Sequence, residues 1–215
     1  PQDKKLFEEA KTKELDQWVS HGVLEVALRS GVPVSRIMPM RWILTWKTVK
    51  EGESQHTKAK ARLVVKGFTD PDLTTLRAEA PTLSKQSRHM ILQLGASRHW
   101  TFEVGDVKTA FLQGDKTETD REVFLEPVPE LKKIYNMDDS QIFRLMGSAY
   151  GLRTAPRHWY QRVKRDMLAL GWRMHSLDGC VFLKFDQKGE LVAVCGVYVD
   201  DFLIAGDLND PTWQK

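Results

Sequence analysis

Two adjacent aspartates, Asp200 and Asp201, interrupt an apolar stretch near the end of the sequence. The stretch reads LVAVCGVYVDDFLIAG over residues 191–206, and its composition is typical of β-strands on both sides of the pair. Tight turns between strands usually carry Asn or Gly, whereas neighbouring carboxylates repel each other. A hard divalent cation, Mg²⁺ or Mn²⁺, is the natural partner of such oxygens. A solvated Asp-Asp turn is the alternative. The Tyr-x-Asp-Asp pattern that begins at Tyr198 does not by itself distinguish a metal site from such a turn.

A third carboxylate, Asp106, stands at the end of a predicted strand (residues 100–104) and leads into the segment DVKTAFLQG. It lies far from Asp200 in the sequence, so only the fold can bring the two strand ends together. Carboxylates from separate strands that hold two divalent cations form the arrangement that nucleotidyl transfer requires. The cations activate a primer 3′-hydroxyl and stabilise the triphosphate and the leaving pyrophosphate.

Composition limits the class of protein but does not identify it. A length of 215 residues with 41% hydrophobic residues suffices for one large domain or two small ones. The net charge of +3 permits a nucleic-acid partner without indicating one. Two cysteines, Cys180 and Cys195, are too few for a disulfide framework and favour a reducing compartment. Neither a secretory signal nor a membrane-spanning apolar run is visible, so we expect a soluble, intracellular protein.

Hydrophobic periodicity predicts helices and strands in mixed order, which indicates an α+β fold. Helices are expected at residues 3–19, 84–98 and 155–171, the second capped by Ser84 and the third with Pro156 in its first turn and Gly171 at its end. Strands are expected at residues 41–50, 59–68, 100–104, 122–127, 141–146, 181–186 and on both sides of the aspartate pair in 191–206. The first two strands predict a long hairpin that is rich in Lys and Arg.

Six segments, taken in order, resemble the reverse transcriptase of Ty1/copia-type retrotransposon polyproteins. They are ARLVVKGF (61–68), EAPTLSK (79–85), DVKTAFLQG (106–114), VFLEP (123–127), RLMGSAYGLRTAPRHWY (144–160) and VYVDDFLIAG (197–206). The resemblance extends from about residue 40 to residue 206 and is looser before residue 36.

The resemblance implies a polymerase palm, an antiparallel sheet backed by helices, together with a fingers subdomain. Residues 1–36 would form an N-terminal helical or linker segment, and 37–215 the reverse transcriptase domain. Within that domain the fingers are expected at about 37–80 and 112–150, and the palm at about 81–111 and 151–215. The sequence ends at PTWQK, so we expect the thumb to be absent, with the ribonuclease H, integrase and protease regions. The segment GFTDPDLTTLRAEAP departs from the loop usual in this family, which leaves the local fingers conformation open.

The resemblance also assigns the catalytic carboxylates. Asp106 matches the first catalytic aspartate of the family, and Asp200 and Asp201 match the pair in its Tyr-x-Asp-Asp hairpin. Asp106 and Asp200 would be the main ligands of Mg²⁺ or Mn²⁺, whereas Asp201 would lie nearby and contribute charge. The Val107 carbonyl is expected to face a metal ion as well.

Further matched positions imply contacts with the incoming dNTP, and these are Lys60, Arg62, Thr109, Ala110, Phe111 and Gly151. Lys60 and Arg62 would neutralise the triphosphate, or else form a solvated strand face. The backbone N–H groups of Thr109 and Ala110 would meet the triphosphate. Phe111 would lie under the sugar and exclude a 2′-hydroxyl, with a core aromatic as the alternative, and Gly151 would let the nucleotide approach the backbone.

Contacts with template and primer are expected at Tyr198 and Arg157, although Arg157 also suits a helix surface. Trp159 and Trp172 fit a hydrophobic core better than a base-stacking platform. The six histidines show no spacing typical of a zinc site or a catalytic base.

These features favour an RNA-directed DNA polymerase that extends a primer with dNTPs on an RNA or DNA template. In the intact element it would be joined to thumb, ribonuclease H and integrase domains, in the cytoplasm and within a virus-like particle. A catalytically inert, nucleic-acid-binding remnant of such a polyprotein is the first alternative. An unrelated metal-dependent phosphohydrolase is the second, and it would not explain the basic hairpin or Phe111.

Overall fold

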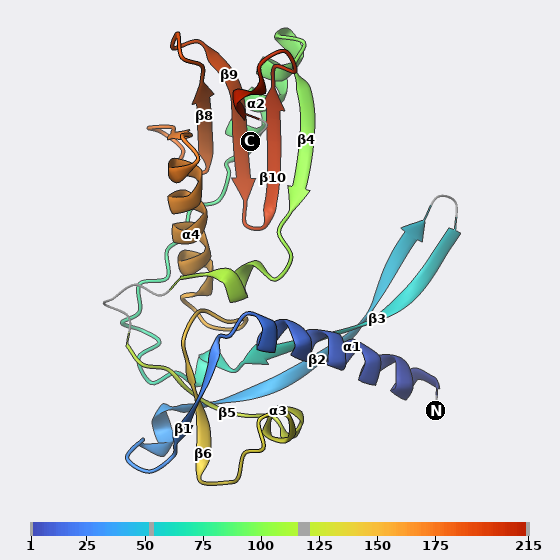
Figure 1. Cartoon of the computed structure of the whole chain (residues 1–215), viewed down its shortest axis with the longest axis vertical. Coiled ribbons are helices and arrows are strands. Elements are labelled where there is room, and N and C mark those ends of the chain that lie inside the picture. The colour runs from blue at the N-terminus through green and yellow to red at the C-terminus, as the bar shows by residue number, and fades with distance from the viewer. Residues whose placement is uncertain (1, 52–53, 116–120, 214–215) are drawn as a thin grey trace. The chain divides into compact units, whose positions relative to one another are not determined.

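The structure, a computed structural model, describes residues 2–51, 54–115 and 121–213. It contains two compact units, of which the first comprises Pro1–Ala78 and Phe111–Ala155 and the second Glu79–Ala110 and Pro156–Lys215. Each unit has its own five-stranded sheet and its own helices (Figure 1). The α+β class predicted from the sequence is confirmed.

The sheet of the first unit has the strand order β1-β6-β5-β2-β3. Its strands are β1 (Leu24–Leu28), β6 (Gln141–Leu145), β5 (Phe124–Glu126), β2 (Ile37–Glu51) and β3 (Ser54–Val65). Strands β2 and β5 pair in parallel, and the other neighbours pair antiparallel. Strands β2 and β3 form the long hairpin expected from the sequence, apart from residues 52–53, which lie outside the described part.

The two faces of strand β3 differ in polarity because its side chains alternate between them. Exposed cations alternate with buried apolar residues along the strand, as Lys58, Lys60 and Arg62 alternate with Ala59, Ala61 and Leu63. Helix α1 (Gln2–Ser20) contacts β3. Trp18 of this helix is fully buried in a core that also contains Leu63 and Phe143. The short helix α3 (Pro129–Ile134) contributes the buried Leu131 to the same core.

The sheet of the second unit is antiparallel throughout, with the order β4-β10-β9-β8-β7. Its strands are β4 (Thr101–Asp106), β10 (Asp201–Gly206), β9 (Leu191–Tyr198), β8 (Val181–Phe185) and β7 (Arg173–Met174). Helix α2 (Lys85–Ser97) contacts β9 and β10 and places Ile91 in the core with Val181 and Val194. Helix α4 (Ala155–Ala169) begins at the last residue of the first unit.

Both helices of the second unit have ends that the sequence predicts correctly. The Ser84 hydroxyl accepts a hydrogen bond from the Ser87 N–H and caps α2. Beyond α4, Gly171 has a φ of 79°, and its N–H and that of Trp172 donate to the Leu168 and Met167 carbonyls. This is the pattern of a glycine-terminated helix.

Three elements were not expected from the sequence, namely β1, α3 and β7. Short 3₁₀ turns at Val34–Arg36, Gly67–Thr69, Ala110–Gln113 and Pro211–Trp213 complete the described structure. Within the described residues, every helix is too short or too polar to cross a membrane.

Candidate active site

Three carboxylates meet at one end of the sheet in the second unit. A carboxylate oxygen from each of Asp106, Asp200 and Asp201 lies within 4.8 Å of the other two. Asp106 is the last residue of β4 and Asp201 the first of β10, and these two residues are Cα partners in the antiparallel pair. The Val107 N–H donates to the Asp200 carbonyl oxygen at 2.9 Å. Like charges opposite each other destabilise a sheet, so a bound cation would offset a cost that this register imposes.

The carboxylate set fits a hard divalent cation. Oxygen ligands of one Mg²⁺ lie about 2.1 Å from the ion and therefore within about 4.2 Å of each other. The three oxygens already lie within 4.8 Å of one another, so small side-chain rotations would bring them to that distance. A donor set of oxygens alone favours Mg²⁺ or Mn²⁺ over softer metals. Asp106 and Asp201 are exposed and Asp200 is half-buried, so the cluster is accessible from solvent.

The turn that carries Asp200 has a strained backbone and is held by a hydrogen bond from helix α4. It consists of Val199 and Asp200 between the paired residues Tyr198 and Asp201. Val199 has a φ of 58°, which is unusual for a β-branched residue. Its carbonyl accepts a hydrogen bond of 2.7 Å from the indole Nε1 of Trp159 in α4. Trp159 is buried as expected, but its role in holding this turn was missed, because the sequence does not show where its N–H points.

A cavity of about 580 Å³ lies beside the aspartates in the second unit. Tyr198 and Asp201 line it, and Lys85 and Arg88 at the start of α2 contribute positive charge. Tyr198 is 55% exposed, so its ring is accessible next to the carboxylates. Its predicted contact with template or primer stays a prediction.

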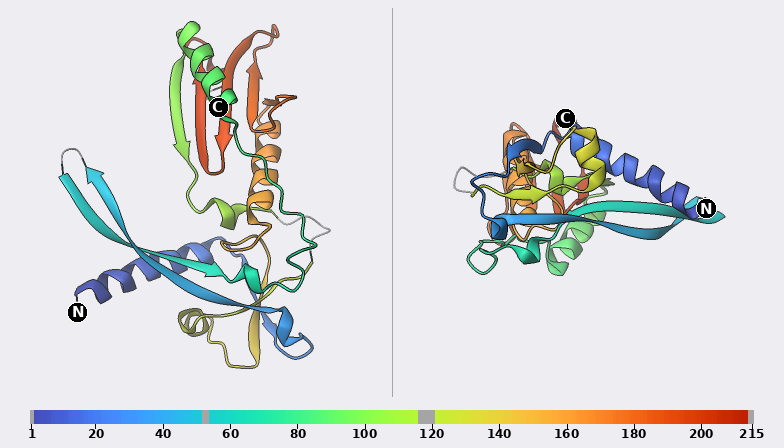
Figure 2. Two further views of the ribbon diagram at one scale, coloured as in Figure 1. Left: turned by 180° about the vertical axis from the view of Figure 1, so that it is seen from behind. Right: turned by 90° about the horizontal axis from the view of Figure 1, so that it is seen from below.

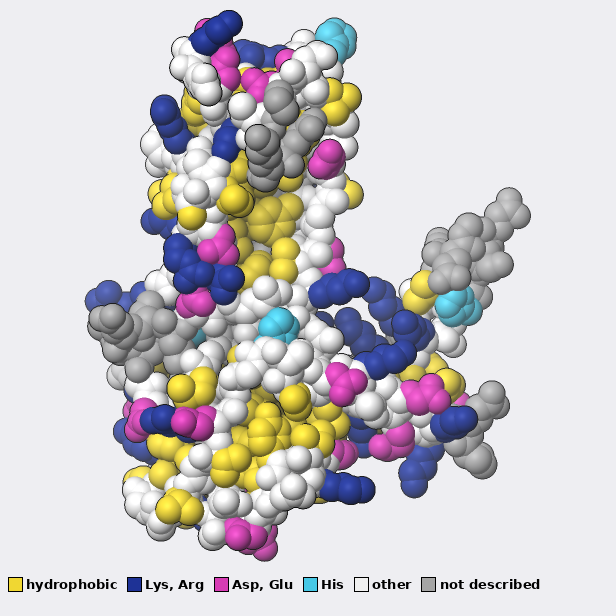
Figure 3. Space-filling view, in the orientation of Figure 1, with side chains coloured by type: hydrophobic (Ala, Val, Ile, Leu, Met, Phe, Trp, Pro, Cys, Tyr) yellow, Lys and Arg dark blue, Asp and Glu magenta, His cyan; other side chains and the backbone are white. Residues whose placement is uncertain are grey.

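In the first unit, Lys60 and Arg62 are exposed on one face of β3. Lys and Arg side chains gather along this hairpin (Figure 3). The Arg62 guanidinium lies 4.7 Å from the centre of the Tyr150 ring, and Phe111 meets the same ring edge to face at 5.4 Å. Phe111 is half-buried and packs against the core. The structure thus joins Arg62 and Phe111 through an aromatic residue that the sequence did not single out for such a role.

Backbone packing requires a glycine at position 151, independently of nucleotide binding. Its φ is 91°, and an added Cβ would lie 2.1 Å from the Val65 carbonyl oxygen. In the same contact, a Cβ on Gly67 would lie 2.2 Å from the Gly151 carbonyl oxygen. The Val65 N–H donates to the Tyr150 carbonyl at 2.8 Å. Both glycines therefore permit two backbone segments to touch, and the nucleotide contact at Gly151 stays a prediction.

The other predicted site residues belong to the second unit. Val107 is half-buried and Ala110 is buried. Thr109 has a φ of 55°, and its hydroxyl donates to the Lys108 carbonyl at 2.6 Å. Arg157 is half-buried in the first turn of α4. Their expected contacts with metal, triphosphate or template stay predictions.

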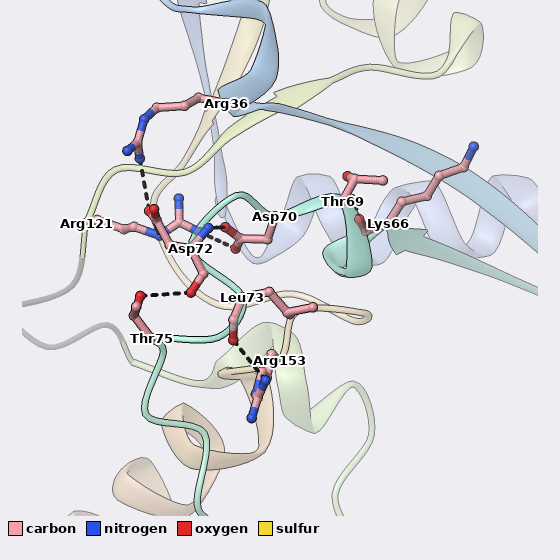
Figure 4. A network of polar contacts seen from close by, with 9 residues as sticks. All are labelled: Arg36, Lys66, Thr69, Asp70, Asp72, Leu73, Thr75, Arg121 and Arg153. Carbon is pink, nitrogen blue, oxygen red and sulfur yellow. Dashed lines mark hydrogen bonds and ion pairs between the residues drawn. The ribbon is translucent and has the colours of Figure 1, made fainter.

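Ion pairs fix the loop after β3, where the sequence departs from the pattern expected of its family (Figure 4). Arg121 binds both Asp70 and Asp72, and Arg36 binds Asp72 at 3.0 Å. Arg153 donates to a backbone carbonyl of the same loop at 2.8 Å. The Asp70 side chain is 3% exposed, so its pairing with Arg121 is required to offset its burial. The arginines lie far from the loop in sequence, so this network could not be read from the local pattern.

Comparisons with known proteins agree with this geometry. Residues 30–210 match the family described as reverse transcriptase (RNA-dependent DNA polymerase). The chain is 33% identical over 177 residues to the retrovirus-related Pol polyprotein from transposon RE1 of Arabidopsis thaliana, an alignment that covers 82% of this chain and 11% of that protein. The corresponding polyprotein from transposon TNT 1-94 of Nicotiana tabacum is 32% identical over 206 residues, which cover 95% of this chain and 15% of that protein.

A more distant relative is the truncated transposon Ty1-A Gag-Pol polyprotein of Saccharomyces cerevisiae. It is 26% identical over 214 residues, which cover 96% of this chain and 16% of that protein. The chain therefore spans 11% to 16% of the length of these three curated relatives. The family match includes all three clustered aspartates and most of the chain, so the chain belongs to the reverse transcriptase (RNA-dependent DNA polymerase) family and is a region of Ty1/copia type.

Proposed function

We propose that this chain is the polymerase region of a retrotransposon polyprotein and extends a primer 3′-hydroxyl with dNTPs on an RNA or DNA template. The observation that carries the proposal is the convergence of Asp106, Asp200 and Asp201 from two paired strands and their turn. When bound, Mg²⁺ or Mn²⁺ supplies the positive charge that activates the hydroxyl and stabilises the leaving pyrophosphate. We assign the fingers to the first unit and the palm to the second.

The residues of the chain would then act by holding and orienting. Asp106 and Asp200 would be the main cation ligands, Asp201 would add negative charge, and the Val107 carbonyl would face the metal. Nucleotidyl transfer asks little covalent chemistry of the protein, so such positioning accounts for most of the catalysis. The two-residue turn and the β4–β10 register fix the backbone of these ligands in advance.

Nucleotide and nucleic acid would contact the remaining predicted positions. Lys60 and Arg62 would bind the triphosphate, Phe111 would lie under the sugar, and the backbone at Thr109, Ala110 and Gly151 would border the dNTP. Tyr198 and Arg157 would contact primer and template. Thumb, ribonuclease H and integrase domains of the intact polyprotein would be the protein partners, within a virus-like particle in the cytoplasm.

Primer extension on an RNA template with Mg²⁺ and dNTPs tests the proposal. Asp200→Asn should lower the rate by more than about 100-fold, because loss of even an outer partner of a metal ligand costs about 10- to 100-fold. Glu103→Gln is the matched control, since Glu103 is an exposed carboxylate on the same strand as Asp106. Equal extension by the Asp200→Asn variant would refute the role of that carboxylate. No extension, even by a longer chain that includes the following polyprotein residues, would favour an inert nucleic-acid-binding remnant.

A further inference from the structure

Helix α1 packs against the Lys- and Arg-rich hairpin of β2 and β3, although it precedes the residues that match the family (Figures 1 and 2). Its buried and half-buried residues recur at helical spacing and include Phe7, Lys11, Glu14, Leu15 and Trp18. Phe7 packs edge to face on Trp46 of β2 at 4.9 Å. The Lys11 ammonium binds Glu130 at 3.1 Å, and Trp18 is fully buried.

One carboxylate of this helix binds the backbone of β3. Strand β3 is at the edge of its sheet, so N–H groups on its outer side have no strand partner. The Leu63 N–H donates to Glu14 Oε1 at 3.0 Å, and the Trp18 indole N–H donates to the same oxygen at 3.4 Å. Two residues further, the Val65 N–H donates to the Tyr150 carbonyl. Glu14 thus satisfies a buried donor that a neighbouring strand would otherwise bind.

The backbone bound by Glu14 carries the cations that would face the triphosphate. Arg62 immediately precedes Leu63, and its side chain extends to the opposite face of the strand. Burial raises the pKa of the Glu14 carboxyl, and the hydrogen bonds from Leu63 and Trp18 and the charges of Arg62 and Lys60 oppose that rise. The Glu14 carboxylate is therefore coupled to both cations through the strand and through space.

We propose that Glu14 is a positioning residue for triphosphate binding, because it fixes the segment of β3 from which Lys60 and Arg62 extend. The inference rests on the proposed function of those two cations. Glu14 does not touch the nucleotide, and its negative charge alone would weaken the binding of an anion. Positioning and charge therefore have effects of opposite sign on affinity, which makes them separable.

Isothermal titration of the full chain with inorganic tripolyphosphate, without divalent cations, measures this effect independently of catalysis. Glu14→Ala should weaken binding about tenfold or more, the size expected for loss of one hydrogen bond to a charged group. Glu14→Gln should not weaken it, because the amide oxygen can still accept the Leu63 N–H. Glu9→Gln, an exposed position of the same helix, is the matched charge control and should change little. Amide exchange at Leu63 should accelerate in Glu14→Ala alone.

The outcomes separate this inference from the function on which it rests. Arg62→Ala should weaken tripolyphosphate binding, and adding Glu14→Ala to it should weaken binding by a smaller factor than Glu14→Ala does alone, because only Lys60 is then left to position. If Arg62→Ala has no effect, or if nothing binds, the proposed role of the hairpin cations fails and the inference fails with it. If Arg62→Ala weakens binding but Glu14→Ala tightens it or leaves it unchanged, Glu14 acts through charge or stability alone and only the inference is overturned. In primer extension, Glu14→Ala should raise KM for dNTP and leave kcat unchanged.

Discussion

Trp159 shows how the aspartate turn depends on a residue that carries no charge. The left-handed conformation of Val199 costs on the order of 1–3 kcal/mol, as for other residues held in sparsely populated backbone regions. The indole hydrogen bond to the Val199 carbonyl opposes relaxation of this turn. Because Asp200 follows Val199 directly, a change in that turn would move the carboxylate.

Trp159→Phe should therefore impair the site more than the fold. The phenyl ring keeps most of the buried apolar contact, whereas the N–H donor is lost and leaves the Val199 carbonyl without this partner. We expect a loss of about 1–2 kcal/mol in the free energy of unfolding, together with slower primer extension under conditions where the variant is fully folded. Urea unfolding and extension assays measure the two effects.

Trp172→Phe is the matched comparison for this variant. Trp172 is buried to the same 5% as Trp159 and belongs to the same unit, but its ring faces the Lys184 ammonium of β8, 5.8 Å from the ring centre, rather than the aspartate turn. It should change stability without a matching change in extension rate at full folding. Equal effects of the two variants on extension would contradict a specific role for the Trp159 indole.

Among the elements, helix α2 is tied to the loop before β8 by one carboxylate. Asp178 accepts hydrogen bonds from the Ser87 hydroxyl at 2.6 Å, the Cys180 N–H at 3.0 Å and the Ser84 N–H at 3.2 Å. Burial raises the pKa of Asp178, but these hydrogen bonds outweigh it and lower the pKa below its ordinary value. The helix start and the loop are thus held by a carboxylate whose ionised form these hydrogen bonds favour.

Asp178→Ala should lower the free energy of unfolding by about 1–3 kcal/mol at pH 7. A carboxyl whose pKa is lowered in the folded state stabilises the protein fully above its unfolded-state pKa of about 3.9, and loses that effect as the pH falls through the folded value. The difference in free energy of unfolding between the original chain and the Asp178→Ala variant should therefore decrease below about pH 4. Urea unfolding at several pH values measures it, with Asp16→Ala at an exposed helix position as control. A gap that stays constant down to low pH would contradict the ionised role.

The elements that the sequence predicted are those with a strong periodic pattern. Alternation in β3, and the cap of α2 at Ser84, are local signals. Strand β1 was missed because it is short and carries Glu25, which pairs with Arg144 of β6 rather than with a local partner. Helix α3, with the sequence PELKKI, lacks an apolar stripe and depends on the burial of Leu131. In each case the deciding contact is distant in sequence.

At the scale of the whole molecule, both cysteines report on the second unit. Cys180 and Cys195 are buried with 1% and 0% exposure. Burial raises the pKa of the Cys180 thiol to about 11, with a contribution from Asp178, and that of Cys195 to about 12. Thiolates are the reactive form of cysteine, so both side chains should be inert while this unit is folded.

Thiol labelling with iodoacetamide at pH 8 should consequently be slow in the native chain and accelerate only when the second unit unfolds. Ser30→Cys adds an exposed thiol in the first unit and should be labelled rapidly, which controls for reagent activity. Labelling followed across a urea titration gives the midpoint for the second unit, and tryptophan fluorescence reports on both units. Rapid labelling of the native cysteines in buffer would contradict their burial.

The sequence predicted the α+β class, the family and the carboxylates of the candidate site. Each of these depends on residue types and short motifs that can be recognised locally in the sequence. The Arg62–Tyr150–Phe111 contacts and the Glu14 hydrogen bond were not predictable, because each joins segments that are distant in the sequence and depends on how those segments pack. Gly151 illustrates the difference. The sequence singled out this glycine as a site of nucleotide approach, but its backbone contact with Val65 is evident only in the structure.

The pairing of Asp106 with Asp201 has a consequence for how copies of such an element decay. Side chains along β4 alternate between the two faces of the sheet, so the loss of one codon within residues 101–105 would turn the preceding residues to the wrong face or displace Asp106 from its partner. All three aspartates would remain legible in the translated sequence. A codon lost from a surface loop would be absorbed far more easily. A search for the three aspartates alone would therefore classify a copy with a codon lost from β4 and a copy with a codon lost from a loop as equally intact. The number of residues within β4 would distinguish the two copies.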